Sequence, residues 1–232
     1  LYMEELNQKK VVESSPKERL VKVTFYITYA FLITTATITF IEAMRTNIYK
    51  VRHILNLETC ISVVAAYFYG RFVSIVDKGD INYKQLNTTR YVDWFITTPI
   101  MLLVLCLAFL YNSGGRLKFT TFLKILAMNF AMLASGYAGA TNMVDKVTAL
   151  GIGFIFFFAL YGFIYYKFIA KKPLFDNVIL YWAFFTFWIC YGLVYLQENK
   201  FKNVAYNYLD LFAKCFVGIF FWAYFTKVFT LK

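Results

Sequence analysis

The chain has 232 residues, of which 60% are hydrophobic, 22% aromatic and only 16% charged. A soluble domain usually carries about 25% charged residues and could not bury this much apolar surface, so the composition excludes an ordinary soluble fold. The net charge of +11 could indicate nucleic-acid binding, but basic residues that set membrane topology account for it better, and we expect no nucleic-acid partner. All four cysteines fall in apolar segments without a CxxC or Cys/His pairing, so we expect neither a metal site nor a disulfide framework.

Apolar runs of about 20 residues recur along the chain, and this length crosses a bilayer as a helix. They predict an all-α membrane protein, a seven-transmembrane-helix bundle, with spans at about 21–44, 54–76, 89–111, 118–140, 148–169, 174–196 and 204–229. Residues 1–20 are polar and are expected to form an extracellular tail or a surface helix. Residues 21–232 are expected to form one transmembrane domain, because no other polar stretch is long enough to fold separately.

The charges of the loops predict the orientation in the membrane. Basic residues gather at alternate loops and at the end of the chain: Arg45, Lys50, Arg52, Arg116, Lys118, Lys124, Lys167, Lys171, Lys172, Lys227 and Lys232. The loops on the other side are nearly balanced, except that Lys200 and Lys202 precede the last span. Because basic loops stay in the cytoplasm, we expect the N-terminus outside and the C-terminus in the cytoplasm.

The first span carries a row of polar residues whose role can be interpreted in two ways. Thr24, Thr28, Thr35, Thr39 and Glu42 are 4, 7, 4 and 3 residues apart and share one helical face. Their hydroxyls either bond back to their own helix or border a wet path through the bundle.

Two glutamates lie near the cytoplasmic ends of the first two spans. Glu42 and Glu58 are either solvated helix-end charges beside basic neighbours or an inner constriction that attracts cations. The sequence leaves both readings open.

The third span contains the run Arg90-Tyr-Val-Asp93-Trp-Phe-Ile-Thr97-Thr-Pro99. Arg90, Asp93, Thr97 and Val104 recur at spacings of 3, 4 and 7 and therefore lie on one helical face. Pro99 removes a backbone hydrogen bond inside the membrane and can bend the helix.

The last span places Lys214 inside the membrane, four residues after Asp210 and on the same helical face. A bare ammonium at that depth costs a few kcal/mol at least. Such a lysine either forms a buried ion pair that only joins helices, or carries a group covalently as a Schiff base with Asp210 as counter-ion. Asp93 and Arg90 add a second carboxylate and a cation. Burying such a cluster costs much free energy if it only joins helices, which favours the covalent interpretation.

The run RYVDWFITTP together with DLFAK in the last of seven spans resembles the microbial (type 1) rhodopsins. This resemblance implies all-trans retinal bound to Lys214 as a protonated Schiff base. It implies Asp93 as counter-ion and proton acceptor, Asp210 as second counter-ion, and Arg90 as the outer gate.

The same resemblance implies the surroundings of the chromophore. Thr97 is expected to hydrogen-bond Asp93, and Asn129, which replaces a usual aspartate, is expected to bond Thr98. The implied retinal pocket comprises Trp94, Met132, Ser135, Gly136, Trp182 and Phe185.

Two details of this pocket concern Asp210. Trp182 falls on the tryptophan that presses on the polyene, so Phe185 replaces a usual tyrosine and removes one hydrogen bond toward Asp210. Either Tyr67 or Tyr69 is expected to meet Asp210, and the sequence does not decide between them. The residues proposed for an outer path are Thr28, Thr35, Tyr67 and Tyr69.

The third span leaves the mode of ion transport open. Outward proton pumps of this kind commonly have a carboxylate where Val104 stands, so reprotonation would come through water or another group such as Glu58. The pattern Leu57-Glu58-Thr59-Cys60 is similar to viral rhodopsins of giant algal and protist viruses. With Glu42, Glu58 and Val104 on a cytoplasmic path, we expect a light-gated cation or proton channel first. An outward proton pump with Asp93 as acceptor is the alternative.

A photosensory rhodopsin with a separate transducer is less favoured, and no enzyme is expected, since no nucleophile–base pair lies outside this cluster. The expected partners are the lipid bilayer, retinal, protons or monovalent cations, and further copies of the chain in a homo-oligomer. The expected location is multi-pass in a plasma or other host cell membrane.

Overall fold

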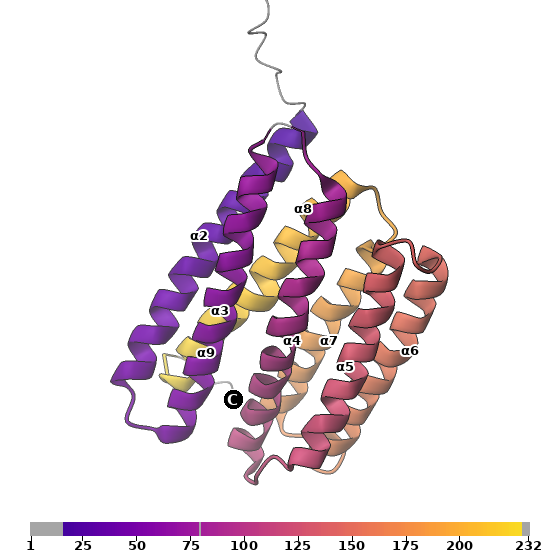
Figure 1. The fold of residues 1–232 in the computed structure, drawn as a ribbon. Helices are drawn as coiled ribbons and strands as arrows, with labels where there is room; N and C mark the ends of the chain where they lie inside the picture. Colours follow the sequence, from indigo (N-terminus) through magenta and orange to yellow (C-terminus); the bar gives the residue numbers. More distant parts are fainter. Residues whose placement is uncertain (1–15, 79, 229–232) are drawn as a thin grey trace, which may run out of the picture.

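The computed structural model describes residues 16–78 and 80–228. Within them, seven helical stretches are long and apolar enough to cross a membrane, as the sequence predicts (Figure 1). The elements are α2 (Pro16–Arg45), α3 (Tyr49–Val76), α4 (Tyr83–Ser113), α5 (Phe119–Ala140), α6 (Lys146–Ile164) with its π-helical continuation η1 (Tyr165–Ile169), α7 (Phe175–Val194), α8 (Asn199–Asp210), the π-helical η2 (Leu211–Phe216) and α9 (Val217–Phe225). The first helix begins at Pro16, inside the stretch expected as a tail, and residues 1–15 of that stretch lie outside the described residues.

Short polar side chains begin two of these helices. The side chain of Asn82 accepts a hydrogen bond from the Gln85 backbone N–H at 3.0 Å and caps α4. Asp145 caps α6 in the same way, with Val147 N and Thr148 N each 3.0 Å from its Oδ2. The hydrogen bond from the Thr148 backbone N–H holds the pKa of the Asp145 carboxyl below its usual range. These caps satisfy backbone N–H groups that a helix start leaves without partners.

The last helix runs through the bundle and connects its two sides. Figure 1 shows the α2–α3 pair on one side and α5 with α6 on the other, with α4 between them. The α8 part of the last helix contacts α2 and α7, and the α9 part contacts α2 and α3. Lys214 lies in the middle of this helix, in η2, and its side chain reaches Asp93 on α4.

The bundle divides into two halves on either side of Lys214. The Arg90 half contains Arg90, Asn203 and the start of α8; the Glu58 half contains Glu58, Val104 and α9. Glu58 and Tyr69 illustrate the separation, because eleven residues on α3 correspond to about 16 Å at the rise of an α-helix. The larger apolar cluster of the protein, with Leu105, Phe109 and others, fills the Glu58 half.

Candidate functional site

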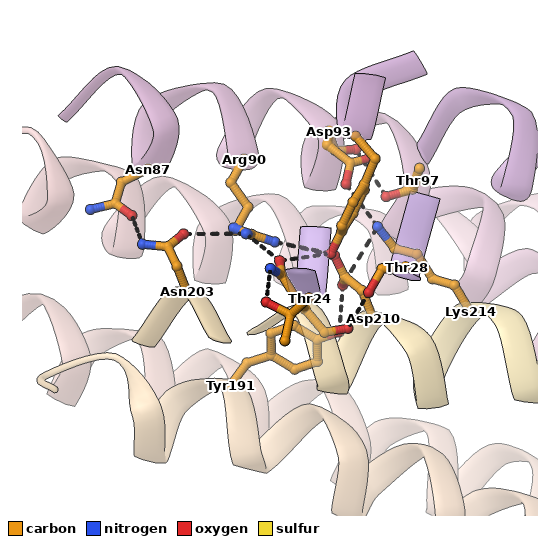
Figure 2. Close-up of polar contacts among 12 residues, drawn as sticks. Thr24, Thr28, Asn87, Arg90, Asp93, Thr97, Tyr191, Asn203, Asp210 and Lys214 are labelled. Atoms are coloured by element: carbon orange, nitrogen blue, oxygen red, sulfur yellow. Dashed lines mark hydrogen bonds and ion pairs between the residues drawn. The ribbon is translucent and has the colours of Figure 1, made fainter. Parts of the chain in front are cut away.

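Lys214 lies at the centre of the bundle between two carboxylates, and Figure 2 shows the cluster. It is 2% exposed, and its Nζ donates a hydrogen bond of 2.8 Å to Asp93 Oδ2. Asp210 Oδ1 lies 3.6 Å from the same nitrogen. Asp93 Oδ1 has no hydrogen-bond partner among the described residues. The lysine nitrogen thus has one carboxylate in direct contact that still has acceptor capacity, and a second one nearby.

Asp210 is held in place by three side chains from different helices. Tyr69 donates to its Oδ2 at 2.7 Å and Tyr191 donates to its Oδ1 at 2.6 Å. Arg90 Nη1 lies 3.3 Å from Oδ2. Because each oxygen accepts from a hydroxyl and the guanidinium adds a positive charge, the buried carboxylate is stabilised in its ionised form.

Arg90 is 1% exposed, and both terminal nitrogens of its guanidinium form hydrogen bonds in the Arg90 half. Its Nη2 donates to Asn207 Oδ1 at 2.8 Å and to Asn203 Oδ1 at 3.2 Å, and Asn203 in turn donates to Asn87 (Figure 2). The guanidinium also lies over aromatic rings, 5.0 Å from the centroid of Phe72. These contacts fix a positive charge between Lys214 and the end of the bundle at which α8 begins.

An apolar cavity of about 120 Å³ ends at Lys214. One water needs only about 10–15 Å³, so the cavity has room for a much larger molecule. Its lining includes Trp94, Thr98, Met101, Met132, Leu133, Gly136, Gly153, Phe154, Phe157, Trp188, Tyr191, Tyr206, Asp210 and Lys214. An apolar, aromatic-walled space closed by an amine fits an elongated apolar aldehyde such as retinal, with Lys214 as the point of attachment.

Glycines permit close approach of side chains around this cavity. A Cβ at Gly136 would stand 2.6 Å from Tyr91 Oη, and one at Gly192 would stand 2.7 Å from a ring carbon of Phe154. Both distances are shorter than real Cβ contacts, so any larger residue at these two positions would displace the walls of the cavity.

The expected register of α7 is wrong by six residues. Trp182 is 51% exposed on the outside of the bundle, and neither it nor Phe185 lines the cavity. Trp188, which is 7% exposed, and Tyr191 line the cavity instead, in the places expected for Trp182 and Phe185. The expected loss of a tyrosine bond to Asp210 is therefore also wrong, because Tyr191 provides it.

Two expected contacts around Lys214 differ in detail. The Thr97 hydroxyl donates to the backbone carbonyl of Asp93 at 2.9 Å rather than to its carboxylate. Ser135 donates to Met132 O at 2.7 Å and does not line the cavity. Asn129 Nδ2 donates to Thr98 Oγ1 at 2.9 Å, so this expected pair is in contact.

The residues expected on an outer path divide between the two halves. Tyr69 contacts Asp210, whereas Tyr67 is 60% exposed and accepts from Arg71. Thr28 is buried and donates to Asn207 O in the Arg90 half. Thr35 lies instead in the Glu58 half, where its Cγ2 is 2.8 Å from the position of a Cβ at Gly218.

Glu58 is buried in the Glu58 half, at 2% exposure. Its Oε2 lies 3.2 Å from the position of a Cβ at Gly218, which is one turn beyond Lys214 on the last helix. Val104 is fully buried in the apolar cluster of this half. Glu42 instead pairs with Arg45 at 3.8 Å, at the end of α2. Of the two glutamates, only Glu58 is buried.

Sequence reasoning missed several polar residues of the site. Asn203 and Asn207, which hold Arg90, and Tyr191, which holds Asp210, were not among the expected site residues. The two asparagines recur four residues apart and precede Asp210 by seven and three, so a search for polar residues on the face of Asp210 could have found them.

Comparisons with known proteins agree with this fold. The family described as bacteriorhodopsin-like proteins matches residues 19–228. The structure is similar to that of the viral rhodopsin OLPVRII, with 52% sequence identity, a TM-score of 0.86 and coverage of 91% of this chain and 100% of that one. Rhodopsin I of Acetabularia shares the fold at 20% identity, with a TM-score of 0.76 and coverage of 90% of this chain and 95% of that one. A comparison with curated protein sequences finds no match.

Proposed function

The chain belongs to the bacteriorhodopsin-like family, as an integral multi-pass membrane protein, and on this premise we propose that it is a light-driven outward proton pump. Ion transport is the activity of the microbial rhodopsins to which it is related. The observation that carries the choice of the proton is Arg90, a buried and immobilised positive charge between the site and one end of the bundle. A fixed guanidinium opposes the passage of metal cations, whereas a proton can move along hydrogen bonds around it.

Retinal supplies the absorption of light when it is bound to Lys214, and we propose all-trans retinal held there as a protonated Schiff base, in the cavity that ends at this nitrogen. The chain contributes an apolar wall around the nitrogen and two carboxylates beside it. Trp94, Met132, Gly136 and Trp188 line this cavity and would bind and orient the polyene.

Asp93 is the proposed acceptor of the proton from Lys214 Nζ. Its Oδ2 lies 2.8 Å from that nitrogen, within the range for direct transfer. Asp210 is less suited to accept, because Tyr69, Tyr191 and Arg90 already occupy its oxygens. Asp210 would therefore remain ionised and keep a negative charge beside Lys214.

Glu58 is the proposed source of the next proton. Val104 provides no carboxylate in the Glu58 half, but Glu58 is buried there without an ion pair among the described residues. A buried carboxyl without a cation is best kept neutral, so it can hold a proton in the dark. Its carboxyl lies beside Gly218, one turn from Lys214 on the last helix. The loop charges favour a cytoplasmic location for this half, and transfer from Glu58 to Lys214 and on to Asp93 would then run outward.

A light-gated cation channel is the second candidate, and the threonine face of α2 favours it. Thr24, Thr28, Thr35 and Thr39 are all buried, and Thr35 Oγ1 has no hydrogen-bond partner among the described residues. Three of the hydroxyls nevertheless have acceptors within the protein, on α2 itself or on α8. This face is therefore largely satisfied without water.

Photocurrents recorded against membrane voltage distinguish the two functions. A pump gives a current that stays outward at all applied voltages, since the energy comes from light. A current that reverses sign at the equilibrium potential of a cation would overturn the pump and establish the channel. The Asp93→Asn variant is the matched control, because it removes the acceptor carboxylate and should abolish the pump current.

A further inference from the structure

Two buried hydroxyls in the Glu58 half have no hydrogen-bond partner. Thr35 Oγ1, on α2, and Ser62 Oγ, on α3, are fully buried, and neither has a partner among the described residues. Glu58 is equally buried and forms no ion pair in the part of the chain that the structure describes. Buried polar groups are rarely left unpaired, because the loss of contact with water is then not compensated.

Other threonines of α2 pair their hydroxyls in the usual way. Thr34, Thr37 and Thr39 each donate to a backbone carbonyl one turn earlier on the helix, at 3.0, 2.9 and 2.9 Å. A hydroxyl inside a membrane helix commonly forms this bond. Thr35 lies on the same helix and does not form it, so its hydroxyl is available for another acceptor.

The side chains of Thr35 and Glu58 meet beside the last helix. A Cβ at Gly218 would stand 2.8 Å from Thr35 Cγ2 and 3.2 Å from Glu58 Oε2. The Thr35 hydroxyl shares its Cβ with that methyl group, and rotation about the Cα–Cβ bond exchanges the positions of the two. Cys215 also lies near Thr35, but a thiol is only a weak hydrogen-bond partner.

Ser62 lies between Glu58 and the level of Lys214. It follows Glu58 by four residues, so both side chains share one face of α3. As the second and the seventh span, α3 and the last helix cross the membrane in opposite directions. Glu58 lies beside Gly218. One turn further along α3 and one turn back along the last helix, Ser62 is therefore at the level of Lys214.

We propose that Thr35 and Ser62 are positioning residues that stabilise Glu58 after it has released its proton. The proposal rests on the proposed role of Glu58 as proton donor. In that step the O–H bond of the Glu58 carboxyl breaks, the proton passes to the unprotonated Nζ of Lys214, and a negative charge stays on Glu58. No cation pairs with this carboxylate among the described residues, so it needs hydrogen-bond donors, and the two free hydroxyls supply them.

The two hydroxyls also favour the release itself. Before the transfer they are unpaired, which is unfavourable, and after it they are paired with a charge. They therefore stabilise the state with ionised Glu58 relative to the dark state.

Thr35→Val and Ser62→Ala test the proposal by removing one hydroxyl each. Each variant should slow recovery of the dark state after a flash by roughly ten-fold, because one hydrogen bond to the carboxylate is lost. Time-resolved absorption of the retinal-loaded protein measures this rate. The Tm should not fall in either variant, since neither hydroxyl has a partner to lose in the dark state among the described residues.

Two further variants are matched controls. Thr34→Val removes a hydroxyl that is bonded to its own helix one residue away, and it should recover at the wild-type rate. Thr35→Ser keeps the hydroxyl and should also recover at about the wild-type rate.

Light-induced infrared difference spectra give a signature that a merely structural role would not produce. The C=O band of protonated Glu58, identified by its loss in Glu58→Gln, should lie where a carboxyl without hydrogen bonds absorbs. It should keep this position in Thr35→Val and Ser62→Ala. A dark-state band that shifts in either variant would overturn the proposal, because that hydroxyl would then already be bonded before the transfer.

The recovery rates separate this inference from the donor role on which it rests. A wild-type rate in Thr35→Val or Ser62→Ala, together with slow recovery in Glu58→Gln, would overturn the inference and leave Glu58 as the donor. Wild-type rates in all three variants would overturn both.

Discussion

The two halves of the bundle treat polar groups in opposite ways. In the Arg90 half, Arg90 and Asp210 are both buried and are tied by hydrogen bonds to residues on α3, α4, α7 and α8. In the Glu58 half, Glu58 is equally buried, but it forms no hydrogen bond or ion pair within the described residues. The hydroxyls of Thr35, on α2, and Ser62, on α3, also have no hydrogen-bond partners within the described residues.

This difference separates two tasks around Lys214. A dense network holds charges in place, because every change of protonation there would leave a partner unsatisfied. A sparse apolar surrounding keeps a carboxyl neutral and leaves it free to give up its proton when its environment changes. The Arg90 half is thus suited to fix the charge distribution, and the Glu58 half to store a proton.

The largest expected effect is at the junction of the two halves. Lys214→Ala removes the amine that lines the cavity among the described residues, so the protein should show no visible absorption band after retinal is added. Absorption spectroscopy of purified protein measures this. Lys200→Ala should retain the band, and a band that persists in Lys214→Ala would contradict the role of this lysine.

Arg90→Gln tests the hydrogen-bond network of the Arg90 half. Removing the guanidinium leaves the buried carboxylate of Asp210 without its cation, which typically destabilises a protein by about 3–5 kcal/mol. Thermal denaturation in detergent should show a large decrease in Tm. The control Arg116→Gln changes an exposed loop residue and should alter stability by less than about 0.5 kcal/mol. Similar small decreases for both variants would show that the network does not constrain Arg90.

Glu58→Gln tests the proposed proton donor in the Glu58 half. The amide keeps the size of the side chain but has no proton to give, so recovery of the dark state after a flash should slow by roughly 100-fold. Time-resolved absorption of the retinal-loaded protein measures this rate. Stability should change little, since Glu58 has no ion pair to lose. Glu42→Gln is the matched control, and equal recovery rates in the two variants would exclude Glu58 as the donor.

Gly218→Ala gives the smallest expected effect and tests the contact between Glu58 and the last helix. The new Cβ would stand 2.8 Å from Thr35 Cγ2 and 3.2 Å from Glu58 Oε2, so we expect a destabilisation of about 1–2 kcal/mol. Gly162→Ala, on α6, meets nothing within 4 Å and should stabilise slightly, because alanine favours the helix. Denaturation curves of the two variants should therefore shift in opposite directions, and a shared direction would argue against close packing at Gly218.

The sequence was sufficient for the seven spans and for the charged residues around Lys214. Spans follow from the length of apolar runs, and Asp93, Arg90 and Asp210 stand out because charged residues inside a membrane are rare. The choice of Tyr69 over Tyr67 needed the structure. The two tyrosines are two residues apart on α3 and point to different sides, and only the packing of α3 shows which side faces Asp210.

The register of α7 could not be predicted because aromatic residues are common on all faces of this helix. Trp182 with Phe185 and Trp188 with Tyr191 have the same spacing of three, so helical periodicity gives the same result for both pairs. The available signal was chemical: only the second pair includes a hydroxyl that can donate to a buried carboxylate. The burial of Lys202, which is 9% exposed, was likewise invisible in the sequence, since a lysine in a short loop is usually solvated.

The π-helical segment η2, Leu211–Phe216, has a consequence for comparing this helix with others. A π-helical stretch holds one residue more than the α-helix that it replaces, so it is equivalent to a single-residue insertion. An alignment with a last helix that is α-helical throughout therefore needs a one-residue gap inside this segment. Conversely, deletion of one residue inside this segment would let it return to α-helical geometry, and α8 and α9 would keep their orientation relative to each other.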